Sequence, residues 1–155
     1  MTSLKTPARP SIVGRCITKR QTADLVVDTP ALMAILRKEL DCSEFFDALN
    51  SAPKRMMAAP NWLEACLVFG RRDAEYASRR LDVVVPDMRS DIIPSDSGMA
   101  EIGRFARRRD GMGSKHHAKL NFGGCIALAR AKSSNQPLLF TGNDFPLTDF
   151  ASALV

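Results

Sequence analysis

The chain has 155 residues, of which 45% are hydrophobic and 25% charged, and its formal net charge is +5. These values are typical of one soluble globular domain, and no apolar run approaches the roughly 18 residues that a membrane span needs. The net charge alone would favour a nucleic-acid-binding protein. However, residues 1–23 hold five basic residues and no acid, so residues 24–155 are neutral overall.

The basic flank at 1–23 is rich in Ser, Thr and Pro, and we expect it to be a disordered arm that precedes a domain at 24–155. A phosphate-binding tail and an unused upstream start are the alternatives. The flank lacks the apolar stretch of a secretory signal. The four cysteines form no CxxC pair, as is usual for free thiols in a reducing cytosol, so we expect a cytoplasmic protein without a cysteine zinc site.

Short apolar runs alternate with helical patterns along the domain. The runs predict strands at 23–28, 55–59, 91–94 and 136–140, and the helical patterns lie at 29–40, 43–52, 61–72, 74–85, 96–109 and 121–132. Pro30 suits the first turn of its helix, and Ser43 is the expected cap of the next helix. A glycine-bearing loop at 111–121 contains both histidines. This order predicts an α/β sandwich with a mostly parallel sheet, which binds ligands at the carboxyl ends of its strands.

Two aspartates are predicted to lie at that carboxyl edge. Asp28 ends the first strand, and Asp144 lies just past the last one. Each residue also has a simpler structural interpretation, because Asp28 suits the cap of the following helix and Asp144 suits an Asx-type turn in the sequence GNDF.

Glu64 is the only charged residue between Arg55 and Arg71, and apolar side chains surround it in the sequence. A carboxylate on such a surface needs a partner, because an unpaired buried charge costs several kcal/mol. Asn61, three residues earlier, offers a structural alternative, since the pair matches a capping box at a helix start. The residues alone leave both interpretations open.

Four segments together resemble the PIN-domain ribonucleases of the VapC toxin type: LVVDTPALMAIL, NWLEACLV, HHAKLNFGGC and PLLFTGNDFPLTDF. The resemblance spans about residues 25 to 150. It implies a three-layer α/β/α sandwich with a mostly parallel central sheet, and metal-dependent cleavage of RNA. It further implies that Asp28, Glu64 and Asp144 are catalytic metal ligands for Mg²⁺ or Mn²⁺, both of which prefer oxygen donors. A VapB-like antitoxin and a homodimer are the partners that it implies.

The chain departs from the family pattern near the expected site. Where the family reads GDC, this chain reads Gly123, Gly124 and Cys125, so a third acid is missing and we expect weakened activity. Pro30 replaces a serine, and His117 replaces a proline. Arg130 stands where the family helix is apolar, which would be costly if the side chain were buried without partners.

Three functions remain open at this level. The first is a toxin-like endoribonuclease whose Arg104–Arg109 segment contacts the RNA backbone, although such runs are more often solvated helix faces. The second is a catalytically inactive PIN-like protein that binds an antitoxin or another partner. The third is a small nucleotide-binding domain that uses GMGSKHH as a phosphate loop, which the lack of a GxxxxGK[ST] motif disfavours.

Overall fold

A computed structural model describes residues 23–37, 42–71, 74–84 and 91–148. The predicted basic arm at 1–22 therefore lies outside the described residues and stays a prediction. The strands are β1 (Leu25–Val27), β2 (Arg55–Ala58), β3 (Ile92–Ile93) and β4 (Leu138–Leu139). The helices are α1 (Thr29–Leu36), α2 (Cys42–Ser51), α3 (Ala59–Phe69), α4 (Ala74–Val84), α6 (Ser97–Asp110), α7 (Phe122–Ser134) and the short 3-10 helix η1 (Phe145–Leu147).

The four strands form one sheet in the order β3-β2-β1-β4, and every pairing is parallel. This confirms the predicted class and strand positions. β1 lies in the interior of the sheet, where Val26 pairs with Met56 on one side and with Leu138 on the other. Parallel pairing brings the carboxyl ends of β1, β2 and β4 to one edge.

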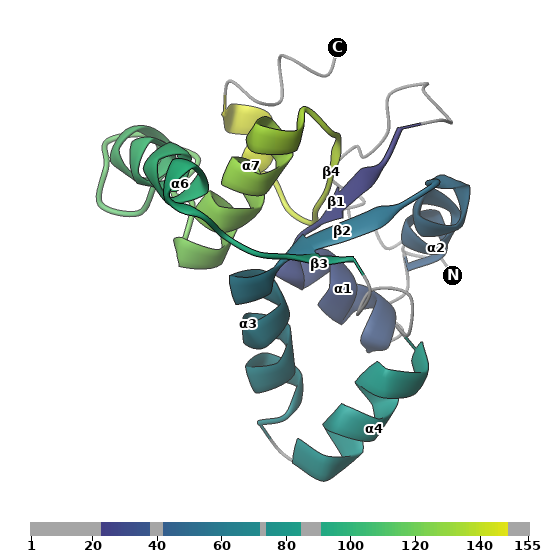
Figure 1. The fold of residues 1–155 in the computed structure, drawn as a ribbon. Helices are drawn as coiled ribbons and strands as arrows, with labels where there is room; N and C mark the ends of the chain where they lie inside the picture. The colour runs from purple at the N-terminus through teal and green to yellow at the C-terminus, as the bar shows by residue number, and fades with distance from the viewer. Residues whose placement is uncertain (1–22, 38–41, 72–73, 85–90, 149–155) are drawn as a thin grey trace, which may run out of the picture.

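Helices cover both faces of the sheet, and the alternating side chains of β1 pack into a different hydrophobic cluster on each face. Leu25 and Val27 pack with α1, α2 and α3, whereas Val26 packs with α6 and α7. Figure 1 shows α6 and α7 side by side on one side of the sheet and α1 and α3 on the other. The arrangement is the three-layer sandwich that the sequence predicted.

Most helices begin close to where the alternation of patterns predicted. Side chains of Asp28, Asp96 and Asn121 accept backbone hydrogen bonds at the starts of α1, α6 and α7. Two predicted boundaries were wrong. Ser43 lies inside α2 rather than at its cap, and α3 begins at Ala59, since Pro60 is accommodated in its first turn.

Two further features were in question from the sequence. Arg130 is half-buried in α7, and its Nε atom is buried without a hydrogen-bond partner among the described residues. A buried Nε atom without a partner carries a cost in stability. Among the helices that the structure describes, none is both long and apolar enough to cross a membrane.

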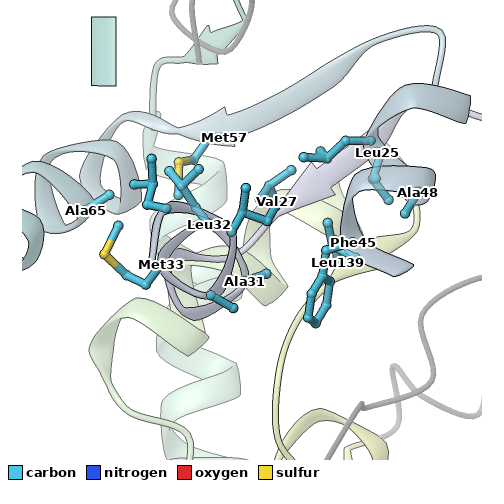
Figure 2. Packing of buried hydrophobic residues seen from close by; sticks show 14 of the residues in the cluster. Leu25, Val27, Ala31, Leu32, Met33, Phe45, Ala48, Met57, Ala65 and Leu139 are labelled. Carbon is cyan, nitrogen blue, oxygen red and sulfur yellow. The ribbon is translucent and has the colours of Figure 1, made fainter. Parts of the chain in front are cut away.

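Substitutions in the core between the sheet and α1 are expected to change the free energy of unfolding most. Leu32 is 1% exposed and belongs to the cluster that also contains Val27, Met57 and Ala65, as Figure 2 shows. We expect Leu32→Ala to lower the free energy of unfolding by about 2–5 kcal/mol, because a cavity forms in packed surroundings. Leu63→Ala, at a residue that is 58% exposed, is the matched control with an expected change below about 0.5 kcal/mol. Urea denaturation measures both, and equal losses would contradict this account of the core.

Candidate active site

Asp28 is fixed at the carboxyl edge of the sheet by its own backbone and side chain. Its N–H donates to the carbonyl oxygen of Leu139 at 2.9 Å, which ties it to the end of β4. Its Oδ1 accepts from the N–H of Thr29 at 2.9 Å, so the predicted capping role is real. The side chain is nevertheless almost completely buried, and one backbone hydrogen bond is little compensation for an ionised carboxylate.

The pKa of Asp28 reports what surrounds it. This pKa is raised from 3.8 to about 7: burial is the largest cause, the hydrogen bond from Thr29 lowers it, and the negative charges of Glu64 and Asp144 add to the increase. The three predicted carboxylates therefore lie within electrostatic range of one another, although they come from β1, α3 and the turn after β4. The structure brings them to one place; what they do there is a separate question.

Glu64 reaches this place because α3 starts directly after β2, the neighbour of β1. The hydroxyl of Thr29 donates to its Oε2 at 2.7 Å. On the other side, a Cβ added at Gly123 would overlap both carboxylate oxygens of Glu64. Glu64 is thus held between the first turns of α1 and α7, and only glycine at position 123 leaves room for it.

Asn61 plays a different part from the predicted one. Ala58 is the N-cap of α3, so Asn61 lies within the helix and the capping-box interpretation was wrong. Its Nδ2 donates to the carbonyl oxygen of Gly123 at 3.0 Å and lies 3.4 Å from the Thr29 hydroxyl. Since that carbonyl only accepts, the amide orientation is fixed, and its buried Oδ1 has no partner among the described residues.

Asp144 stands at the rim of the same place. It is exposed and precedes η1, where its side chain makes no capping hydrogen bond, so the Asx-turn interpretation is not supported. The turn is anchored instead by Phe145, which is buried and packs 4.9 Å from Phe140 between ring centroids. The packing of Phe145 therefore fixes the backbone position of Asp144, while the Asp144 carboxylate makes no capping hydrogen bond of its own.

Gly124 is buried in the first turn of α7, where its N–H donates to Asn121 Oδ1 at 2.8 Å. A Cβ at this position would lie 3.3 Å from that oxygen, 3.4 Å from Leu120 Cδ2 and 3.6 Å from the Phe145 ring. A Cβ here would therefore meet side chains only, and it would fit with small adjustments. Because residue 124 is glycine, this position supplies no carboxylate.

The two histidines do not join this site. His116 Nδ1 accepts from the N–H of Ala118 at 3.2 Å and lies 3.8 Å from Asp110 Oδ1, so it organises the loop at 111–121. His117 is exposed. Sequence reasoning named the three acids, but it gave Asn61 a capping role and gave Thr29 and Gly123 no part in orienting Glu64. The available signals were a polar residue inside an apolar helix and a glycine pair at a helix start.

Within the described ranges, no group of three or more His, Cys, Asp or Glu side chains is close enough to hold a metal ion by itself. A hard divalent cation such as Mg²⁺ keeps several waters and needs only one or two carboxylates. Repulsion at Asp28 and the unpartnered oxygen of Asn61 are both features that a hydrated cation would relieve. The donor set therefore fits such an ion.

Comparison with known proteins assigns the chain to a family. The PIN domain family matches residues 25–151. The chain is 40% identical over 128 residues to a ribonuclease VapC of Mycolicibacterium smegmatis, covering 83% of this chain and 98% of that protein. It is 36% identical over 129 residues to ribonuclease VapC42 of Mycobacterium tuberculosis, with the same shares covered. The chain belongs to the VapC ribonucleases of the PIN domain family.

Solved structures agree on the fold. VapC20 of Mycobacterium tuberculosis, a toxin that cleaves the sarcin-ricin loop, aligns with a TM-score of 0.58 at 14% identity, covering 83% of this chain and 94% of that one. VapBC2 of Rickettsia felis, bound to a DNA fragment from its promoter, aligns with a TM-score of 0.55 at 12% identity, covering 72% and 82%. Likeness at this level of identity supports the PIN fold alone.

The raised pKa of Asp28 predicts how stability depends on pH. Between about pH 4 and pH 7 the folded protein retains a proton that the unfolded chain has lost, so the free energy of unfolding falls as pH rises through that window. The fall amounts to at most roughly 4 kcal/mol. We expect Asp28→Asn, which cannot ionise, to remove most of it in urea denaturation with EDTA present. A variant that kept the full dependence would show that another group is responsible.

Alanine is expected to change the pKa of Asp28 at position 123 but not at position 124. Gly123→Ala should displace the Glu64 carboxylate from Thr29 and so lower the pKa of Asp28, which the charge of Glu64 helps to raise. Gly124→Ala is the matched control, because its Cβ does not meet Glu64. Both changes gain up to about 1 kcal/mol of helix propensity. Carbon-13 NMR titration of the Asp28 carboxyl measures the difference, and equal pKa values in the two variants would rule out the contact.

Proposed function

We propose that this protein is the toxin of a VapBC-like toxin–antitoxin pair and that it cleaves RNA in a reaction that depends on a divalent metal. Membership of the VapC ribonuclease family supports the reaction class. The observation that carries the proposal is the buried Asp28 carboxyl at the carboxyl edge of the sheet, whose pKa is raised in part by the charges of Glu64 and Asp144.

Each of the three acids has a proposed role that follows from its position. Asp28 is the innermost ligand, because burial leaves its charge most in need of a cation. Glu64 is oriented by Thr29 and by the bare Cα of Gly123, and it directs a second carboxylate to the same point. Asp144, which is exposed, would supply the third carboxylate from the solvent side. Mg²⁺ or Mn²⁺, when bound, would polarise a phosphodiester oxygen or activate a water.

Gly124 leaves the proposed site one carboxylate short. The site then offers one oxygen and one negative charge fewer to a divalent ion, so metal affinity and rate should both be lower than with an aspartate there. Nothing in the surrounding backbone prevents a side chain at this position. We therefore propose a working but weakened nuclease.

The proposed partners are RNA, a VapB-like antitoxin and a second copy of this chain, and the proposed place of action is the cytoplasm. The toxin–antitoxin assignment follows from the VapC family, and the same fold occurs in the VapBC2 complex of Rickettsia felis. The loss at Gly124 also favours a second candidate: an inactive PIN protein that only binds its antitoxin.

The test compares RNA cleavage by the natural chain with that of Asp28→Ala and Gly124→Asp, each with Mg²⁺ and with Mn²⁺. We expect Asp28→Ala to be inactive. Gly124→Asp should raise the rate at limiting metal by about tenfold or more, since even residues that only support ligands alter metal affinity 10–100-fold.

Circular dichroism confirms that each variant is folded. Cleavage by Asp28→Ala at the natural rate would place the chemistry elsewhere. If neither the natural chain nor Gly124→Asp cleaves RNA, the inactive binding protein is the better description.

A further inference from the structure

Positive charge is concentrated on one part of the domain. Residues 104–119 hold six basic residues and one acid, whereas the rest of 24–155 holds eleven basic and sixteen acidic residues. All six basic side chains are exposed: Arg104, Arg107, Arg108, Arg109, Lys115 and Lys119. A neutral domain that gathers its positive charge in this way offers a phosphate chain one favourable surface.

An exposed aromatic ring lies within this charge. Phe105 is 52% exposed on α6, and the guanidinium carbons of Arg104 and Arg108 lie 4.9 Å and 5.2 Å from its ring centroid. Both contacts are within cation–π range. Phe105 thus places an exposed apolar ring between two cations. We call Arg104, Phe105 and Arg108 the α6 patch.

The other arginines of this run are not equivalent to the α6 patch. Arg109 is held by two hydrogen bonds of its Nε and by its Nη2 to the fully buried Asp110, so its guanidinium neutralises a carboxylate of the fold. Arg104 forms an ion pair with Glu101 at 2.7 Å, and both side chains are well exposed. Such exposed pairs are weak, so a phosphate can compete for Arg104.

The α6 patch lies on the helix that packs against α7, the helix whose start borders the candidate site. Gly103 lies against α7, where a Cβ would be 3.7 Å from the carbonyl oxygen of Cys125. The end of α6 is tied to the start of α7, since Leu120 N–H donates to Asp110 O at 2.8 Å and Met112 N–H donates to Leu120 O at 2.9 Å. Figure 1 shows the two helices side by side.

We propose that the α6 patch binds unpaired RNA, with one base stacked on Phe105 and with Arg104 and Arg108 on the flanking phosphates. The proposal rests on the proposed nuclease function and deepens it by naming the form of RNA that is recognised. Unpaired bases expose the faces that stack on aromatic rings, whereas a duplex hides them. The two cations beside the ring supply the phosphate contacts that such stacking platforms require.

The test measures binding by fluorescence anisotropy to a labelled unstructured RNA and to the same strand in a duplex, with EDTA present to prevent cleavage. Phe105→Ala should weaken binding of the unpaired strand by roughly 5- to 100-fold and affect the duplex little. Replacing Arg104 and Arg108 together by Gln should reduce the slope of log affinity against log salt by about 1.4, the value for two phosphates of a single strand.

Matched controls come from α4. Tyr76→Ala removes an aromatic side chain that is 54% exposed, and Arg79→Gln removes an exposed arginine that pairs with Glu75 as Arg104 does with Glu101. Both controls should bind RNA like the natural chain. Phe105→Trp should retain binding of the unpaired strand, because it keeps a stacking surface.

Natural affinity in Phe105→Ala would overturn the proposal, as would equal weakening for the unpaired strand and the duplex. Polyglutamate serves as a competitor, and displacement of RNA from the natural chain but not from Phe105→Ala would point to an acidic peptide instead. A natural chain that cleaves RNA while Phe105→Ala binds normally would overturn this inference alone. A natural chain that neither binds nor cleaves RNA would overturn the proposed function as well.

Discussion

The arrangement of the site depends on a single electrostatic conflict, the placing of the Asp28 carboxyl in a desolvated position beside two other acids. The single hydrogen bond from Thr29 does not offset the cost of burying an ionised Asp28 carboxylate. Specific contacts nevertheless hold the acidic side chains close together. Thr29 and Gly123 hold Glu64 there, and Asn61 joins α3 to α7 through the Gly123 carbonyl. Strain that is maintained by its surroundings is characteristic of a functional site.

Gly123 and Gly124 are neighbours with different physical meanings. A side chain at position 123 would have to displace the Glu64 carboxylate, whereas one at position 124 would need only small shifts of Asn121 and Leu120. The first glycine is therefore tied to the present position of Glu64, whereas the second has no such contact. The two positions separate a contact that orients a carboxylate from the proposed absence of another carboxylate.

The sequence predicted the sheet and the edge because both follow from local rules. Apolar runs alternating with helical spacing define a parallel sheet, and a parallel sheet places Asp28 and the segment before Asp144 together. Asn61 was misjudged because a helix cap and a buried bridging amide produce the same local pattern. Its true partner, Gly123, lies 62 residues away, and no local periodicity encodes that contact. The roles of the acids came from family resemblance, while the contacts that orient them came only from the structure.

The interior position of β1 in the sheet affects the order in which the protein can fold during synthesis. Among the described strands β1 is the first in the chain, yet one of its two neighbours, β4, is the last of them to be made. Sequence-distant parallel pairing is slow to form, and domains emerge from the ribosome from the N-terminal end. Until residues 138–139 have been synthesised, the N–H of Asp28 lacks its Leu139 acceptor and β1 lacks its β4 neighbour. Asp28, Glu64 and Asp144 therefore come together only after nearly the whole domain has been made.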